Sequence, residues 1–256
     1  MDTLPQSPDS SAPQRKPRPR ILSSILLMAA LVATLFTAFP ATFFSGSLRD
    51  QLTVLLTPQA PGNTLPDGTP RPQIKIGIVA GHWGNDSGTV CENGATEADV
   101  NLKIATLVQQ KLAALGFEPD LLKEFDPRLT GYRSAVLVSI HNDSCNYIND
   151  RATGFKVAAA MSARDTNLAN RLAACLRDRY QRSTGLPLHT SVTNDMTFYH
   201  AFDEIDSNTT AAIIETGFLN LDYKILTEQP DLVATGVASG ILCYINNENI
   251  VPLPTP

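Results

Sequence analysis

The sequence predicts an α/β fold, with a mostly parallel twisted sheet, helices on both faces, and one transmembrane helix before the folded domain. Three observations lead to this prediction. Short runs of β-branched and other apolar residues alternate with longer segments of helical periodicity, which is typical of parallel sheets covered by helices. The chain has 256 residues, enough for one well-buried domain with appendages. Finally, a long uncharged stretch precedes the domain.

That uncharged stretch covers residues 21–39, ILSSILLMAALVATLFTAF. As a helix it would be about 28 Å long, which matches the hydrocarbon core of a bilayer. Four basic residues lie within residues 15–20, so we expect a cytoplasmic tail at 1–20 and an extracytoplasmic body. The alternative is a cleaved signal peptide and a secreted protein, but Pro40 interrupts the small-residue pattern near the end of the run. We therefore predict a single-pass protein of the cell membrane.

The segment at residues 40–73 is rich in Pro, Gly and Thr, so we interpret it as a linker between the membrane and a folded domain at 74–248, with a short tail at 249–256. The formal net charge is −5. Residues 1–20 contribute four basic and two acidic residues, which leaves 16 basic and 23 acidic residues, or −7, for the rest. An acidic body of this kind excludes nucleic acid as the expected partner. Nothing in the sequence indicates the oligomeric state.

The domain begins with a predicted strand, IKIGIVA at residues 74–80, and Gly81, Gly84 and Gly88 then indicate a loop. Thr96, followed three residues later by Asp99, resembles a capping box and predicts a helix that ends near Gly116. Further strands are predicted at 117–123, 134–140, 154–161 and 211–215, and further helices at 165–180 and 231–245.

Four chemically active side chains are predicted to meet at one edge of this sheet. His82, His141 and Glu215 follow or end apolar strands, and Glu97 lies in the first turn of the first helix. Ligands in open α/β sheets gather at the carboxyl ends of the strands. Two imidazoles and one carboxylate suit a catalytic Zn²⁺ with an open position for water, and a further carboxylate would move the proton. From spacing alone, Glu97 and Glu215 could exchange these two roles. Taken singly, each residue also has an ordinary structural explanation.

Four cysteines, Cys91, Cys145, Cys175 and Cys243, lie in the part of the chain that the predicted topology places outside the cytosol. Disulfides are therefore permitted, although spacing does not pair the cysteines. The alternative for Cys175 and Cys243, which fall in helical patterns, is that they are small buried apolar residues.

Several motifs together identify a family resemblance over most of the body. GHWGNDSG at 81–88, the helix opened by Glu97, VSIHND at 138–143 and IIETGFLN at 213–220 resemble the zinc-dependent N-acetylmuramoyl-L-alanine amidases of family 3. The resemblance implies that His82, Glu97 and His141 bind zinc and that Glu215 is the catalytic residue. It also implies peptidoglycan as substrate, with cleavage of the amide between N-acetylmuramic acid and L-alanine during cell-wall remodelling or turnover.

The chain departs from the family pattern at three places. Val79-Ala80 stand where the family usually has Asp-Pro, Trp83 replaces a glycine, and Asn220 follows Gly-Phe-Leu directly. These departures motivate one alternative, a catalytically weakened peptidoglycan-binding or regulatory module of the same fold. A further alternative is a related zinc hydrolase that acts on a different amide.

Other residues near the implied site have weaker predictions. Cys91 and Cys145 lie in the loops after the two implied zinc histidines, so a disulfide bracing the site is expected. We interpret His189 and His200 as solvated or structural histidines rather than substrate contacts, and the acidic pair Asp203 and Glu204 as surface residues.

Overall fold

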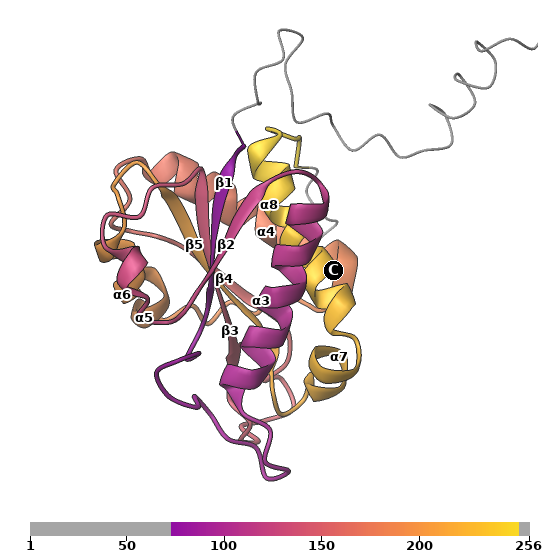
Figure 1. Cartoon of the computed structure of the whole chain (residues 1–256). Coiled ribbons are helices and arrows are strands. Elements are labelled where there is room, and N and C mark those ends of the chain that lie inside the picture. Colours follow the sequence, from indigo (N-terminus) through magenta and orange to yellow (C-terminus); the bar gives the residue numbers. More distant parts are fainter. Residues whose placement is uncertain (1–72, 251–256) are drawn as a thin grey trace, which may run out of the picture. The chain divides into compact units, whose positions relative to one another are not determined.

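Five strands form one sheet in the order β2-β1-β3-β5-β4. The computed structural model describes residues 73–250 and is drawn in Figure 1. The first four strands in this order pair in parallel and β4 pairs antiparallel to β5 at the edge, so the predicted mostly parallel sheet is confirmed. The strands are β1 (Lys75–Ala80), β2 (Glu118–Leu122), β3 (Val136–Asp143), β4 (Lys156–Ala159) and β5 (Thr210–Phe218).

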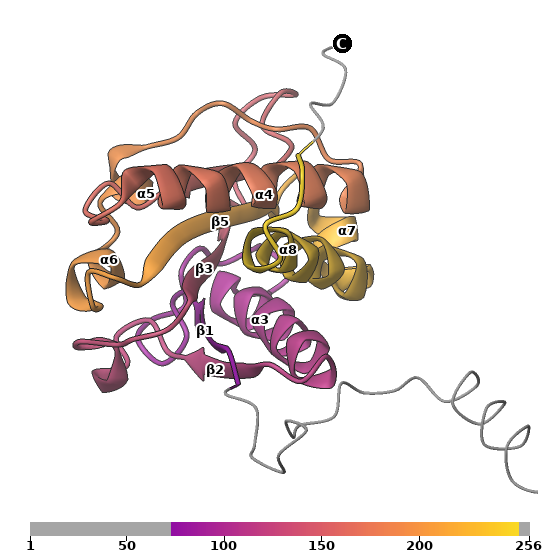
Figure 2. The same cartoon turned by 90° about the horizontal axis from the view of Figure 1, so that it is seen from above.

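The two faces of the sheet are covered differently. The three long helices lie together on one face, as Figure 2 shows: α3 (Glu97–Ala114), α4 (Thr166–Thr184) and α8 (Pro230–Ile245). Short elements pack on the other face: the 3-10 helix η2 (Pro127–Leu129), α5 (Asn194–Thr197) and α6 (His200–Glu204). A further short helix, α7 (Tyr223–Glu228), precedes α8. Both faces are covered, as predicted, although unequally.

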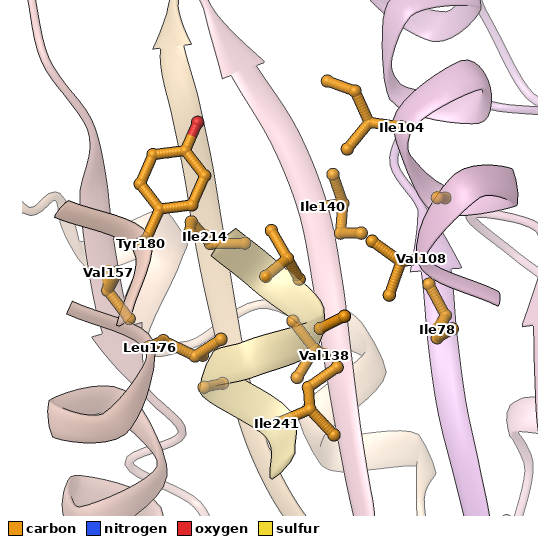
Figure 3. Packing of buried hydrophobic residues seen from close by; sticks show 14 of the residues in the cluster. Ile78, Ile104, Val108, Val138, Ile140, Val157, Leu176, Tyr180, Ile214 and Ile241 are labelled. Atoms are coloured by element: carbon orange, nitrogen blue, oxygen red, sulfur yellow. The ribbon is translucent and has the colours of Figure 1, made fainter. Parts of the chain in front are cut away.

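Strand alternation divides the core into two layers. Ile76, Ile78 and Ala80 of β1 are buried against the long helices. Val79 lies between Ile78 and Ala80 in the chain and is buried on the opposite face of the sheet. Figure 3 shows the larger layer, where aliphatic side chains of β1, β3, β4 and β5 meet side chains of α3, α4 and α8. Burial of one such side chain contributes roughly 1.5 to 3 kcal/mol, so this layer is the main source of the domain's stability.

Helix boundaries follow from capping residues. The Thr96 side chain accepts a hydrogen bond from the Asp99 N–H at 3.1 Å, so the predicted start of α3 is confirmed. Asp165 caps α4, and Gly185 ends it in the left-handed region at φ 71°. The predicted end of this helix at residue 180 was four residues short, because Tyr180 is fully buried and the polar residues after it continue the helix to its glycine cap.

Two disulfides are present in the described residues. Cys175 of α4 bonds Cys243 of α8, so these cysteines are both buried and paired. The two helices approach closely at this point. A Cβ on Gly240 of α8 would lie 2.8 Å from Leu176 Cα, so only glycine fits there. The second bridge, Cys91–Cys145, confirms the pairing expected beside the implied site.

The predicted tail at 1–20, the transmembrane helix at 21–39 and nearly all of the linker at 40–73 lie outside the described residues. Among helices within residues 73–250, none has the length and apolar character needed to cross a membrane.

Candidate metal centre

The sheet topology brings the four predicted side chains together. β1, β3 and β5 are neighbours, and their carboxyl ends lie at the same edge. His82 comes two residues after β1, while His141 of β3 and Glu215 of β5 are register partners. Glu97 is the first residue of α3 and reaches the same place. The predicted convergence is therefore present in the structure.

Three of these side chains form a cluster that could hold a metal ion. His82 Nε2 and His141 Nδ1 each lie 3.3 Å from the same oxygen, Glu97 Oε1. One ligand atom from each of the three residues lies within 4.8 Å of the others. Glu97 and His141 are buried and His82 is half-buried, so one side of the cluster is open to a ligand. Two imidazoles and one carboxylate are a donor set that suits zinc.

The backbone at Gly81-His82 explains why this dipeptide stands at the end of β1. A Cβ on Gly81 would lie 2.3 Å from the His141 ring, so a side chain there would displace the imidazole. His82 has a φ of 64°, in the left-handed region that non-glycine residues rarely adopt. Its N–H donates to Glu124 Oε2 at 2.7 Å, which holds this conformation in place. Strained backbone of this kind is often found at functional sites.

Additional groups lie next to each of the three candidate ligands. His82 Nδ1 lies 2.6 Å from Asp86 Oδ1. The carboxylate of Glu124 lies near His141, with Oε2 3.5 Å from Nε2, but this buried nitrogen has no hydrogen-bond partner among the described residues. Glu97 Oε1 accepts hydrogen bonds from the Asn101 side chain at 3.2 Å and the Asn142 N–H at 3.3 Å. Carboxylates that contact the second nitrogen of a histidine commonly fix the ring orientation at metal sites.

The electrostatics of the cluster favour a cation. The hydrogen bond and charge of Glu97 raise the pKa of His82 to about 9, against the opposing effect of burial. Burial disfavours the ionised form of Glu97, but hydrogen bonds from His141 and His82 outweigh it and hold the Glu97 pKa well below its usual range. The cluster therefore stabilises positive charge between these side chains, and this fits a divalent metal ion.

Glu215 lies beside this cluster, in register with His141. Its Oε2 atom is buried and has no hydrogen-bond partner among the described residues. Burial raises the pKa of Glu215 to about 7, although the charge of His141 acts in the opposite direction. Lys156 of the edge strand β4 lies directly across from Glu215 and forms an ion pair with Asp143. A carboxyl with a pKa near neutrality can both accept and donate a proton.

The sequence prediction missed Glu124, the carboxylate that contacts both histidine segments. Glu124 is buried and comes two residues after β2, so it satisfies the same strand-end criterion that selected the other residues. Its short, partly polar strand gave a weaker apolar signal than β1 or β3. Val79 and Ala80, where the family usually has Asp-Pro, are both fully buried core residues. A carboxylate that follows β2 thus contacts both histidines, while β1 ends in two apolar residues.

His200 contacts the site indirectly. Its Nε2 lies 3.1 Å from Glu124 Oε1, its Nδ1 lies 2.7 Å from Glu204 Oε1, and its ring stacks on Phe125. The structural interpretation of His200 is consistent with these contacts. Glu204 was predicted as a surface residue, and this prediction was partly wrong. Its carboxylate is half-buried against His200. His189 does not reach the cluster: it hydrogen-bonds with Ser191 and packs on Phe218.

The loops that follow the two histidines are tied together. The Thr89 N–H donates to Glu97 Oε2 at 3.3 Å, and the Thr89 hydroxyl accepts from the Cys145 N–H at 3.4 Å, next to the Cys91–Cys145 disulfide. Asn220 closes this region by donating from its side chain to the Cys145 carbonyl at 2.9 Å. On the β2 side, Trp83 is partly buried and lies with its ring 5.7 Å from Lys123 Nζ.

Comparisons with known proteins place the chain in a family and find solved structures of similar fold. The family model described as N-acetylmuramoyl-L-alanine amidase matches residues 76–243. A search of curated proteins found no match. Among solved structures, the amidase from Clostridium difficile 630 is 24% identical with a TM-score of 0.54, and the match covers 69% of this chain and 99% of that one.

Two further structures are similar to the same extent. Ami1 from Mycobacterium smegmatis is 17% identical with a TM-score of 0.54, and 68% of this chain and 98% of that chain are covered. The catalytic domain of CwlV from Bacillus (Paenibacillus) polymyxa var. colistinus is 24% identical with a TM-score of 0.52. That match covers 68% of this chain and 99% of the CwlV domain. At these identities the likeness establishes a shared fold.

Proposed function

The chain belongs to the N-acetylmuramoyl-L-alanine amidase family, and we propose that it cleaves the amide between N-acetylmuramic acid and L-alanine of peptidoglycan with zinc held by His82, Glu97 and His141. The main support for this proposal is that these three side chains lie close together beside Glu215. Their residue types, their mutual distances and the carboxylates behind the two imidazoles all suit a hydrolytic zinc site.

Bound zinc would act as a Lewis acid toward the scissile carbonyl and lower the pKa of water. The proton transfers fall to Glu215. Its carboxylate accepts a proton as the water oxygen bonds to the lactyl carbonyl carbon. When the carbon–nitrogen bond breaks, the same carboxyl gives that proton to the alanine nitrogen. A pKa near 7 lets one group perform both transfers at neutral pH.

Other residues keep these groups in position. Asp86 orients the His82 ring, Glu124 holds the His82 backbone and places a negative charge beside His141, and Asn101 and Asn142 hold the Glu97 carboxylate. Lys156, which is buried and paired with Asp143, lies across from Glu215, so a cation stays close to the carboxylate that must ionise. Rigid support of this kind matters because small displacements of reacting groups are costly to the rate.

The N-terminal sequence supports a location for this activity. Residues 21–39 are uncharged and follow a basic segment, which favours a single membrane span with the domain on the outer side. Residues 40–73 would then connect the amidase domain to the membrane next to the peptidoglycan layer. Secretion after signal cleavage is the alternative, and N-terminal sequencing of the mature protein distinguishes the two.

The proposed role of Glu215 is tested by the Glu215→Gln variant. The variant keeps the size of the side chain and its distance from the histidines, so we expect it to bind zinc as the wild type does but to lose release of stem peptides from purified peptidoglycan. Glu228→Gln, at an exposed position of α7, is the matched control and should keep full activity.

Product analysis in the same experiment separates the alternatives. Intact stem peptides with free L-alanine amino groups, together with intact glycan, support the amidase. Binding to peptidoglycan with zinc present and no new amino groups would favour a binding module. New amino groups on other residues would favour a related hydrolase acting on a different amide.

A further inference from the structure

A pocket of about 480 Å³ lies beside the metal centre and has no part in the proposed proton transfers. Its lining comes from the loops that follow β1, β3 and β5 and from the first residue of α7. The lining residues are Val90, Cys91, Glu92, Asn93, Cys145, Asn146, Tyr147, Leu219, Asn220 and Tyr223.

This pocket is close to the candidate metal ligands. Val90 directly follows Thr89, whose N–H donates to Glu97 Oε2 at 3.3 Å. The Cys91–Cys145 disulfide forms part of the wall, and Asn220 bonds the Cys145 carbonyl. A substrate group that extends from the reacting amide toward this side would therefore enter the pocket.

The lining combines neutral amides, tyrosines and small apolar groups, and Glu92 is its only charged residue. Resting on the function proposed above, we propose that this pocket binds the glycan chain of peptidoglycan. N-acetylated sugars are uncharged and offer hydroxyl and acetamido groups for hydrogen bonds and apolar ring faces for packing. Pockets that bind such molecules combine apolar and aromatic surface with a few polar groups.

The charge of the lining makes this pocket better suited to the uncharged glycan than to the stem peptide. The stem peptide carries free carboxylates, which Glu92 would repel. Lys123 is a cation at the end of β2, on the other side of β1 from β3 and β5, and it does not line the pocket. The carboxylates of the peptide are therefore better matched by the region of Lys123 and Trp83, which leaves the pocket for sugars.

Some lining groups are rigid and others are available to a ligand. The Asn93 side chain donates to the Tyr223 hydroxyl at 2.7 Å, and Tyr147 donates to Asp150 Oδ1 at 2.7 Å, so both rings are held. The Tyr147 residue is 62% exposed, which presents its ring to a sugar. Within residues 73–250 the Asn146 side chain makes no hydrogen bond, so its amide is free to bind hydroxyl or acetamido groups.

The test is binding of peptide-free glycan chains, made of alternating N-acetylglucosamine and N-acetylmuramic acid, to the full-length protein by calorimetry. We expect Tyr147→Ala to weaken binding by up to roughly tenfold, because the variant removes the exposed ring. Asn146→Ala should weaken it by a smaller factor. Phe198→Ala is the matched control, since Phe198 is an aromatic residue that is 61% exposed and lies outside the pocket.

Equal glycan affinity of the wild type and both pocket variants would overturn the proposal, as would absence of glycan binding by the wild type. Binding of the free stem peptide that is lost in Tyr147→Ala would also overturn it, because the pocket would then hold peptide. Stem-peptide release by the same wild-type sample is measured in parallel. Absence of that release contradicts the proposed function, and the calorimetric result still decides what the pocket binds.

Discussion

At the scale of single residues, the candidate site depends on contacts that allow little substitution. Gly81 leaves room for the His141 ring, and His82 occupies a backbone conformation that its bond to Glu124 holds. The sequence predicted all four residues of the proposed chemistry because each stands at a strand end or at a helix start. Glu124 was missed because no apolar run before it was strong enough to draw attention to the end of β2.

The clearest residue-level prediction concerns Glu124. Replacing Glu124 with Gln keeps the shape of the side chain but removes the charge beside His141 and weakens the contact with the His82 N–H. We expect roughly 10- to 100-fold weaker zinc binding, in line with other outer-shell carboxylates. Competition with a zinc-binding dye measures this change.

Glu118→Gln is the matched control for this variant, because Glu118 lies on the same strand in an exposed position. It should leave zinc affinity unchanged. An unchanged affinity in Glu124→Gln as well would show that Glu124 does not support the metal centre.

At the scale of elements, long segments were predictable and single-turn elements were not. The helices α3, α4 and α8 each show periodicity over several turns and have capping residues or a proline at the start. α5 and α6 are too short for periodicity to be visible, so the sequence did not predict the helix that begins at His200. Its partner Glu124 is 76 residues away, and no local pattern indicates such a pairing.

The two disulfides connect different pairs of elements and should have separable effects. Cys175–Cys243 joins α4 to α8 across 68 residues, so replacing both cysteines with Ala should lower the free energy of unfolding by about 2 to 4 kcal/mol. Zinc affinity should stay the same, since neither cysteine lies near the cluster. Urea unfolding and the dye competition measure the two quantities.

Cys91–Cys145 is the matched comparison, because it joins the loops that carry the Thr89 bond to Glu97. Replacing these two cysteines with Ala should reduce both stability and zinc affinity. Identical effects of the two double variants on zinc affinity would contradict the prediction that only the Cys91–Cys145 bridge supports the metal centre.

At the scale of the whole molecule, the residues that stabilise the domain and the residues of the candidate site lie in different parts of the sheet. The long helices on one face supply the main hydrophobic core, whereas the site residues lie at the carboxyl edge of β1, β3 and β5. The alternation of strands and helices made this arrangement predictable. The unequal covering of the two faces was not, because the segments on the second face are short and mostly polar.

The central claim is that a zinc ion at His82, Glu97 and His141 is required for amide cleavage. Its most direct test is to measure bound zinc and stem-peptide release by the same full-length protein, before and after removal of metal with a chelator. We predict one zinc per chain, loss of release on chelation, and recovery on addition of one equivalent of zinc. Release that continues without metal, or one bound zinc with no free L-alanine amino groups produced, would contradict the account.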